Sequence, residues 1–118
     1  FISGQLPISS NGQMIKGKIG KDLTLEDGQK ASQLCVINIL AQVKKALGGD
    51  LDKVKSCIKI TGFVNSTDDF KDQPKVINPA SETLSTVFGD NGKHARAAIS
   101  ANSLPLGAAV EIDAIFEI

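Results

Sequence analysis

Arg96 is the side chain in this sequence best suited to hold a ligand. It stands among small apolar residues, in the run Ala95-Arg96-Ala97-Ala98-Ile99. A guanidinium presents a planar fork of N–H donors that fits a carboxylate or a phosphate, and small neighbours leave that fork accessible. The alternative is an arginine on an edge strand that points to solvent. The pattern therefore predicts an anion-binding residue, and a solvent-facing arginine remains the alternative.

Glu111 is the second candidate. It lies between Val110 and Ile112, so on a strand it would point away from their apolar face. A carboxylate placed there could act as a general base, position a water molecule or accept a hydrogen bond. The alternative is a solvent-facing strand carboxylate. Asp113, on the same face, is expected to be solvated or paired with a lysine.

His94 is the only histidine and lies two residues before Arg96, on the same predicted strand face. It could contact a ligand, or it could be a structural or surface residue. We predict no metal site, because no second histidine exists and Cys35 and Cys57 form no CxxC or Cys/His pattern. Both cysteines are predicted to be buried free thiols, which favours a reducing compartment and hence a cytoplasmic protein.

The composition argues against two classes of partner. Thirteen Lys and Arg residues balance thirteen Asp and Glu residues, and the chain has neither Tyr nor Trp. A nucleic-acid-binding protein usually carries a basic face or an aromatic stacking platform, so we do not expect nucleic acid as a partner. No apolar run reaches the roughly 20 residues of a membrane-spanning helix, so no membrane association is expected.

Strand patterns alternate with two helical patterns along the chain. Strands are predicted at residues 1–7, 13–19, 54–64, 94–103 and 108–118. In the third of these, Ile58 is expected to share a face with Ile60 and Val64, and Cys57 to lie on the other face. Because the sequence opens within a strand pattern, we expect that a preceding strand is missing.

The helices are predicted at residues 24–47 and 72–88. Thr24 and Asp27 have the spacing of a capping box, while Asn78-Pro79 resembles a helix start and could break the second helix. The order of elements predicts an α+β fold with both helices on one face of a mixed sheet. A length of 118 residues predicts one domain covering 1–118.

Three segments resemble motifs of the Rid family, also called YjgF-like or endoribonuclease L-PSP. Ser3-Gly-Gln-Leu-Pro7 resembles the family's SGQ(I/L)P strand. Gly62-Phe-Val64 followed by Asp69-Phe70 resembles its central segment. Ala95-Arg96, Leu104-Pro105 and Val110-Glu-Ile-Asp-Ala114 together resemble its C-terminal signature, so the chain is identified as a member, of a divergent branch.

The resemblance implies a chorismate-mutase-like fold and a homotrimer with a central barrel and ligand clefts between subunits. It further implies hydrolysis of reactive 2-imino or enamine acids to 2-oxo acids and ammonia, without a cofactor. Arg96 matches the arginine that clamps the substrate carboxylate, and Glu111 matches the glutamate that positions water. Ala98, Ser3 and His94 are expected to line the cleft.

Two departures from the family pattern favour an alternative. Many members have Cys where this chain has Ala98, and archetypal members use an N-terminal Tyr, which this chain lacks. An asparagine of the second helix could correspond to Asn78, or Ser81 could take its place. The alternative is a non-catalytic protein that binds small carboxylate metabolites in the same cleft; an endoribonuclease is disfavoured by the charge and composition.

Overall fold

The structure is a computed structural model that describes residues 1–118, with four strands and two long helices. The strands are β1 (Ile2–Gln5), β2 (Ser56–Asn65), β3 (Ala95–Ala101) and β4 (Val110–Glu117). The helices are α1 (Leu25–Ala46) and α2 (Gln73–Phe88), and three short 3-10 turns lie at Leu51–Lys53, Gly89–Gly92 and Pro105–Gly107.

The four strands form one mixed sheet in the order β1-β4-β2-β3. β4 is antiparallel to both of its neighbours, whereas β2 and β3 run parallel and are connected through α2. β1 and β3 are therefore the two edges of the sheet. This is the α+β, chorismate-mutase-like arrangement that the sequence predicted.

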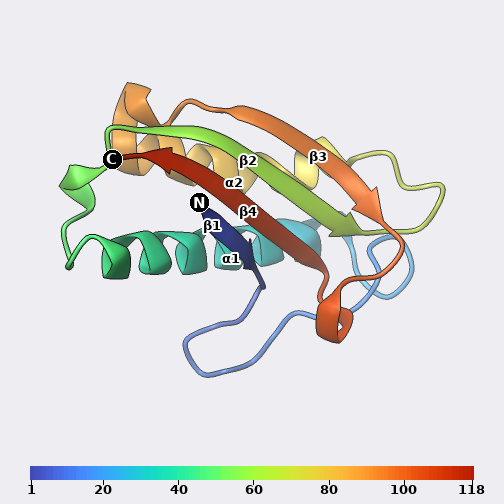
Figure 1. The fold of residues 1–118 in the computed structure, drawn as a ribbon. Coiled ribbons are helices and arrows are strands. Elements are labelled where there is room, and N and C mark those ends of the chain that lie inside the picture. Colours follow the sequence, from blue (N-terminus) through green and yellow to red (C-terminus); the bar gives the residue numbers. More distant parts are fainter.

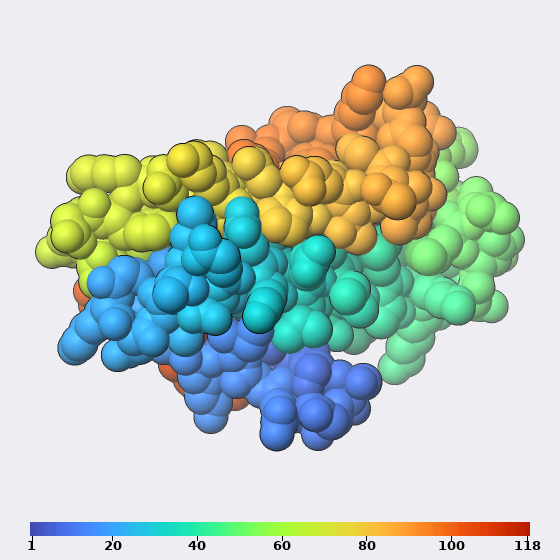
Figure 2. All heavy atoms as spheres, turned by 180° about the vertical axis from the view of Figure 1, so that it is seen from behind, coloured from blue at the N-terminus to red at the C-terminus, as the bar shows by residue number.

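Both helices pack on the same face of the sheet (Figure 1). Seen from behind, α1 and α2 lie side by side and form the surface of that layer (Figure 2). The core between the layers contains fully buried aliphatic side chains, among them Ile39 of α1, Ile77 and Leu84 of α2, and Ile60 and Ile112 of the sheet. No element of the chain covers the other face of the sheet (Figure 1).

The predicted start of α1 is confirmed in its atomic detail. Thr24 is the N-cap, its side chain accepts a hydrogen bond from the Asp27 N–H, and the Asp27 carboxylate accepts one from the Thr24 N–H. These two bonds satisfy donors that the first turn of a helix leaves free. Gly48 and Gly49 follow the helix with φ angles of 68° and 99°, the left-handed conformation that glycine adopts without strain.

The suggested break of the second helix at Asn78-Pro79 is wrong, because α2 runs through Pro79 without interruption. Proline lacks an N–H, so the carbonyl of Lys75, four residues earlier, loses its helical partner. The Gln29 side-chain amide of α1 donates to this carbonyl at 3.0 Å. A contact between helices thus compensates for the missing bond, which no local sequence pattern could indicate.

The predicted strand at residues 13–19 is also wrong. This segment forms only isolated bridges, including Lys16 with Ala108 and Ile19 with Ser66. Turns at Gly17 and Gly20, with φ angles of 130° and 95°, interrupt any continuous ladder. The sheet accordingly has one strand fewer than expected.

The predicted faces of β2 are reversed at its start. Cys57 is buried, whereas the side chain of Ile58 is 49% exposed. The register with β4 shifts between Cys57 and Lys59, as in a β-bulge, and one extra residue inverts the alternation of faces. Ile60 and Val64, beyond the bulge, are buried as predicted.

Candidate functional site

Arg96 lies on β3, the edge strand, with its side chain on the face that the helices cover. It pairs in register with Ile60, a core residue of β2. Its side chain reaches past the sheet edge to the first half of α2, where it meets Asn78 and Ser81. The guanidinium is therefore held between a strand and a helix rather than extended into solvent, which was the alternative interpretation.

The hydrogen bonds of Arg96 leave part of its fork unused. Nη1 donates to Asn78 Oδ1 at 3.0 Å and to Ser81 Oγ at 3.2 Å, and Nη2 donates to the Pro74 carbonyl at 3.4 Å. A guanidinium has five N–H groups, so these three bonds leave about two, one on Nε and one on Nη2. Nε and Nη2 form one edge of the guanidinium, the arrangement that binds a carboxylate through two parallel bonds.

His94 joins the same cluster from the turn before β3. Its Nδ1 lies 2.6 Å from the Gly92 carbonyl and its Nε2 lies 2.8 Å from Ser81 Oγ. A carbonyl can only accept, so Nδ1 carries the proton, and in the neutral ring Nε2 is then the acceptor. The structure thus brings together Arg96 and His94, two of the predicted residues, through Ser81.

Asn78 and Ser81, the two alternatives considered for the second helix, both accept a hydrogen bond from Arg96. They are three residues apart on α2 and therefore share a helix face. The three-residue spacing would predict a shared face only if the helix were known to continue through Pro79. The pattern Asn78-Pro79 resembles a helix start, so the sequence gives no sign that Ser81 meets His94.

Glu111 lies on the opposite, uncovered face of the sheet. Its neighbours Val110 and Ile112 are fully buried, while its own side chain is half-buried and pairs across the sheet with Phe63. The carboxylate extends over Gly4 of β1, where a Cβ atom would overlap it. No side chain or backbone group of the chain donates a hydrogen bond to it, so its acceptor capacity is free for a ligand or a water molecule.

Ser3 and Ala98, the other predicted cleft residues, divide between these two regions. Ala98 is two residues after Arg96 on β3, packs against the core and pairs with Gly62 of β2. Ser3 is exposed on β1 and borders a hollow of about 360 Å³ together with Asp113. Ala98 therefore belongs with Arg96, and Ser3 with Glu111.

Arg96 and Glu111 are not brought together within one chain. Arg96 lies at the β3 edge on the helix side, and Glu111 lies beside β1 on the open side, with β2 between their strands. A single site that uses both residues therefore requires a second copy of the chain.

The two cysteines are free and buried, as predicted. Burial raises the pKa of the Cys57 thiol to about 11, and burial, together with the charge of Glu111, raises the pKa of the Cys35 thiol further. The Cys35 thiol donates to the Val110 carbonyl at 3.6 Å. Neither thiol is therefore a nucleophile near neutral pH.

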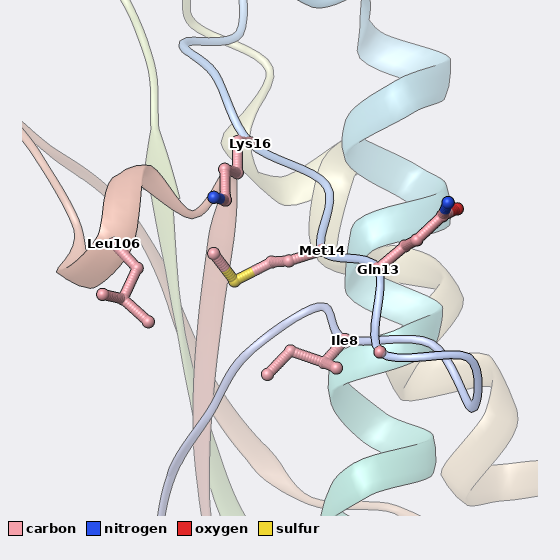
Figure 3. Close-up of a pocket in the computed structure, with 6 residues that line it drawn as sticks. Ile8, Gln13, Met14, Lys16 and Leu106 are labelled. Carbon is pink, nitrogen blue, oxygen red and sulfur yellow. The ribbon is translucent and has the colours of Figure 1, made fainter.

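The largest hollow of the chain contains none of the predicted site residues. It has a volume of about 570 Å³ and lies between the N-terminal loop and the turn at Pro105–Gly107. Ile8, Met14, Lys16 and Leu106 approach one another there, whereas the Gln13 side chain points away (Figure 3). Its open shape and single charged side chain offer little to orient a small polar ligand.

No helix is long and apolar enough to cross a membrane. No group of three or more His, Cys, Asp and Glu side chains is placed to hold a metal ion.

Comparison with known proteins places the chain among related sequences and folds. Residues 1–117 match the family model described as "YjgF/chorismate_mutase-like, putative endoribonuclease". Protein TCP17 of Trypanosoma cruzi is 44% identical over 118 residues, which span 99% of this chain and 73% of that protein.

Two solved structures share the fold closely. Protein Atu1372 of Agrobacterium tumefaciens, of unknown function, has 52% identity and a TM-score of 0.96, covering 98% of this chain and 75% of that one. A "putative endoribonuclease" of Shewanella oneidensis has 30% identity and a TM-score of 0.93, covering 98% of this chain and 76% of that one.

Proposed function

The chain belongs to the YjgF/chorismate-mutase-like family, and from that premise we propose that it hydrolyses reactive 2-imino and enamine acids to 2-oxo acids and ammonia. The reaction would take place in a cleft between subunits of a homotrimer, with Arg96 and Glu111 contributed by neighbouring chains. The proposed reaction uses no cofactor.

The free edge of Arg96 is the observation that carries the proposal. Asn78, Ser81 and the Pro74 carbonyl fix the guanidinium in one orientation. The two N–H groups that remain match the two oxygens of a carboxylate, which every 2-imino acid carries next to its reactive carbon. A side chain already held in place loses little conformational freedom when the ligand binds.

Glu111 supplies the second requirement, an acceptor that orients water. The imine carbon is already electrophilic, so the enzyme needs to hold the acid and align a water molecule. Water then adds to the carbon while one of its protons passes to the nitrogen. As the carbonyl forms, the proton of the added hydroxyl also passes to the nitrogen, and the carbon–nitrogen bond breaks to release ammonia. The unpaired Glu111 carboxylate can accept the water's proton and return it to the leaving nitrogen.

The positions of the two residues support a cyclic assembly. Arg96 belongs to one edge of the sheet, and Glu111 lies beside the other edge. If the β3 edge of one chain docks near β1 of the next, every contact joins an Arg96 to a Glu111. Such head-to-tail contacts form a ring when the rotation between neighbours closes, and we propose closure after three chains. The uncovered sheet face carries Phe63 and the 47% exposed Ile99, apolar residues that a central barrel would bury.

The first test is the release of 2-oxo acid from imines generated in situ by an amino-acid oxidase, with the protein and its Arg96→Ala variant. We expect the protein to accelerate 2-oxo acid release and the Arg96→Ala variant to lose this acceleration, because the variant has no guanidinium to bind the substrate carboxylate. Arg96→Lys is a useful second variant, since it keeps the charge but not the fork. Absence of acceleration across a broad panel of imines would overturn the proposal.

A non-catalytic binding protein for small carboxylate metabolites is the second candidate. Ala98 offers no thiol beside Arg96, and the chain has no tyrosine. In that case 2-oxo acids would bind with dependence on Arg96, without turnover. Calorimetric titration with 2-oxo acids, run beside the imine assay, separates the two candidates.

Endoribonuclease activity is the function that the family description names. The zero net charge and the absence of Tyr and Trp give this chain little to bind RNA. RNA binding that weakens steeply with salt, or RNA cleavage by the purified protein, would instead favour an endoribonuclease over the two candidates above.

A further inference from the structure

Ser81 and His94 form a hydrogen bond that imine hydrolysis, as proposed above, does not use, since that reaction needs Ser81 only to orient Arg96. Imine hydrolysis as described above needs a clamp and an oriented water, not a nucleophilic side chain. Ser81 nevertheless lies with its Oγ 2.8 Å from His94 Nε2, and the other ring nitrogen of His94 lies 2.6 Å from the Gly92 carbonyl. A hydroxyl, a base and a group that orients the base are the three parts of an activated serine.

The orientation of His94 is the feature that makes it a base. Because the Gly92 carbonyl holds the proton on Nδ1, the lone pair of Nε2 points at the Ser81 hydroxyl. This is the relation in which an imidazole removes the proton of a serine as the oxygen attacks. Here a backbone carbonyl takes the place that a carboxylate holds in the familiar triads.

Arg96 adds a positive charge to the same oxygen. Its Nη1 donates to Ser81 Oγ at 3.2 Å, so the oxygen accepts from a cation and donates to a base. A cationic donor lowers the energy of the alkoxide that develops during attack. Ser81 and His94 are both half-buried and Asn78 beside them is exposed, so the cluster lies at the surface, outside the three hollows of the structure.

From this geometry we propose that Ser81 is a nucleophile with His94 as its base, and that the chain hydrolyses small activated esters through an acyl-serine. Ser81 Oγ attacks the carbonyl carbon while its proton passes to His94 Nε2. The carbon–oxygen bond to the alcohol breaks, and the alcohol leaves with the proton from His94. Water, deprotonated by His94, then cleaves the acyl-serine and returns the free acid.

Covalent labelling with diisopropyl fluorophosphate tests the proposal on the assembled protein without any substrate. We expect a mass increase of one diisopropylphosphoryl group per chain, with loss of fluoride, located on Ser81 by peptide mass spectrometry. Ser81→Ala should abolish the label, and His94→Gln should slow labelling by about a hundredfold, the lower range of a general base. Hydrolysis of 4-nitrophenyl acetate should fall in parallel.

Ser85 provides the matched control. It lies on the next turn of α2, is exposed, and has no histidine partner, so Ser85→Ala should label as the unchanged protein does. No label on Ser81 after prolonged exposure, or equal labelling of Ser81 and Ser85, would overturn the proposal. Because labelling requires neither an imine nor Glu111, its failure leaves imine hydrolysis untouched, and the converse also holds.

Discussion

The Arg96 region and the Glu111 region differ in how much of their surroundings one chain supplies. Arg96 is fixed by three hydrogen bonds that it donates to α2, a helix adjacent to its own strand in sequence and space. Glu111 has an open sheet face, a glycine beneath it and no hydrogen-bond donor. The Arg96 region is therefore ordered by contacts within one chain, whereas the Glu111 region is open and makes no such contacts.

If both residues serve one site, as proposed above, the chain builds that site from two copies. The clamp needs rigidity, and the core behind α2 supplies it. The carboxylate needs a free acceptor, and the absence of a Cβ at Gly4 gives it room.

The largest effect is expected at the open region, from Glu111→Gln. The substitution keeps the shape but removes the base, so kcat for imine hydrolysis should fall roughly a hundredfold or more. Binding of 2-oxo acids, which depends on Arg96, should change little. Asp113→Asn, two residues along the same face, is the matched control; equal losses in both variants would contradict a specific role for Glu111.

Asn78→Ala tests the closed region and should have a smaller effect. It removes one of the hydrogen bonds that orient the guanidinium, a neutral acceptor bound to a charged donor. We expect KM to rise roughly tenfold, near the lower end for a hydrogen bond to a charged group, with kcat largely retained. Steady-state kinetics on one imine substrate would show it, and a fall in kcat alone would place Asn78 elsewhere in the mechanism.

The buried Cys57 thiol on the covered face of the sheet should make the free energy of unfolding depend on pH. Burial raises the pKa of Cys57 from 9.0 to about 11, so the unfolded thiol ionises before the folded one. The free energy of unfolding should therefore fall as the pH rises from about 9 to 11. Urea unfolding across this range should show a steeper decline for the unchanged protein than for Cys57→Ser; equal slopes would mean that water reaches this thiol.

The sequence was most informative where a residue's environment is local. The Thr24–Asp27 cap, the two helices and the alternation of β4 follow from nearest neighbours and were predicted correctly. Arg96 and Glu111 could be singled out because a charge among small or apolar residues is conspicuous. Their placement on opposite faces also follows from strand periodicity, once the pairing of the strands is known.

Features that depend on distant contacts could not be predicted. α2 passes through Pro79 because Gln29, on another helix, satisfies the freed carbonyl. Cys57 and Ile58 exchange faces because of a register shift against β4. Ser81 and His94 meet because α2 and the start of β3 are packed together, although 13 positions separate them in the sequence.

Mixed assemblies of two inactive variants test the central claim, that one site takes Arg96 from one subunit and Glu111 from the next. Arg96→Ala and Glu111→Gln proteins would be unfolded and refolded together in equal amounts, and native mass spectrometry would confirm mixed trimers. Random mixing in a ring leaves about a quarter of the interfaces with both residues intact, so about a quarter of the original imine-hydrolysing activity should return. Mixed trimers that stay inactive would contradict the shared site.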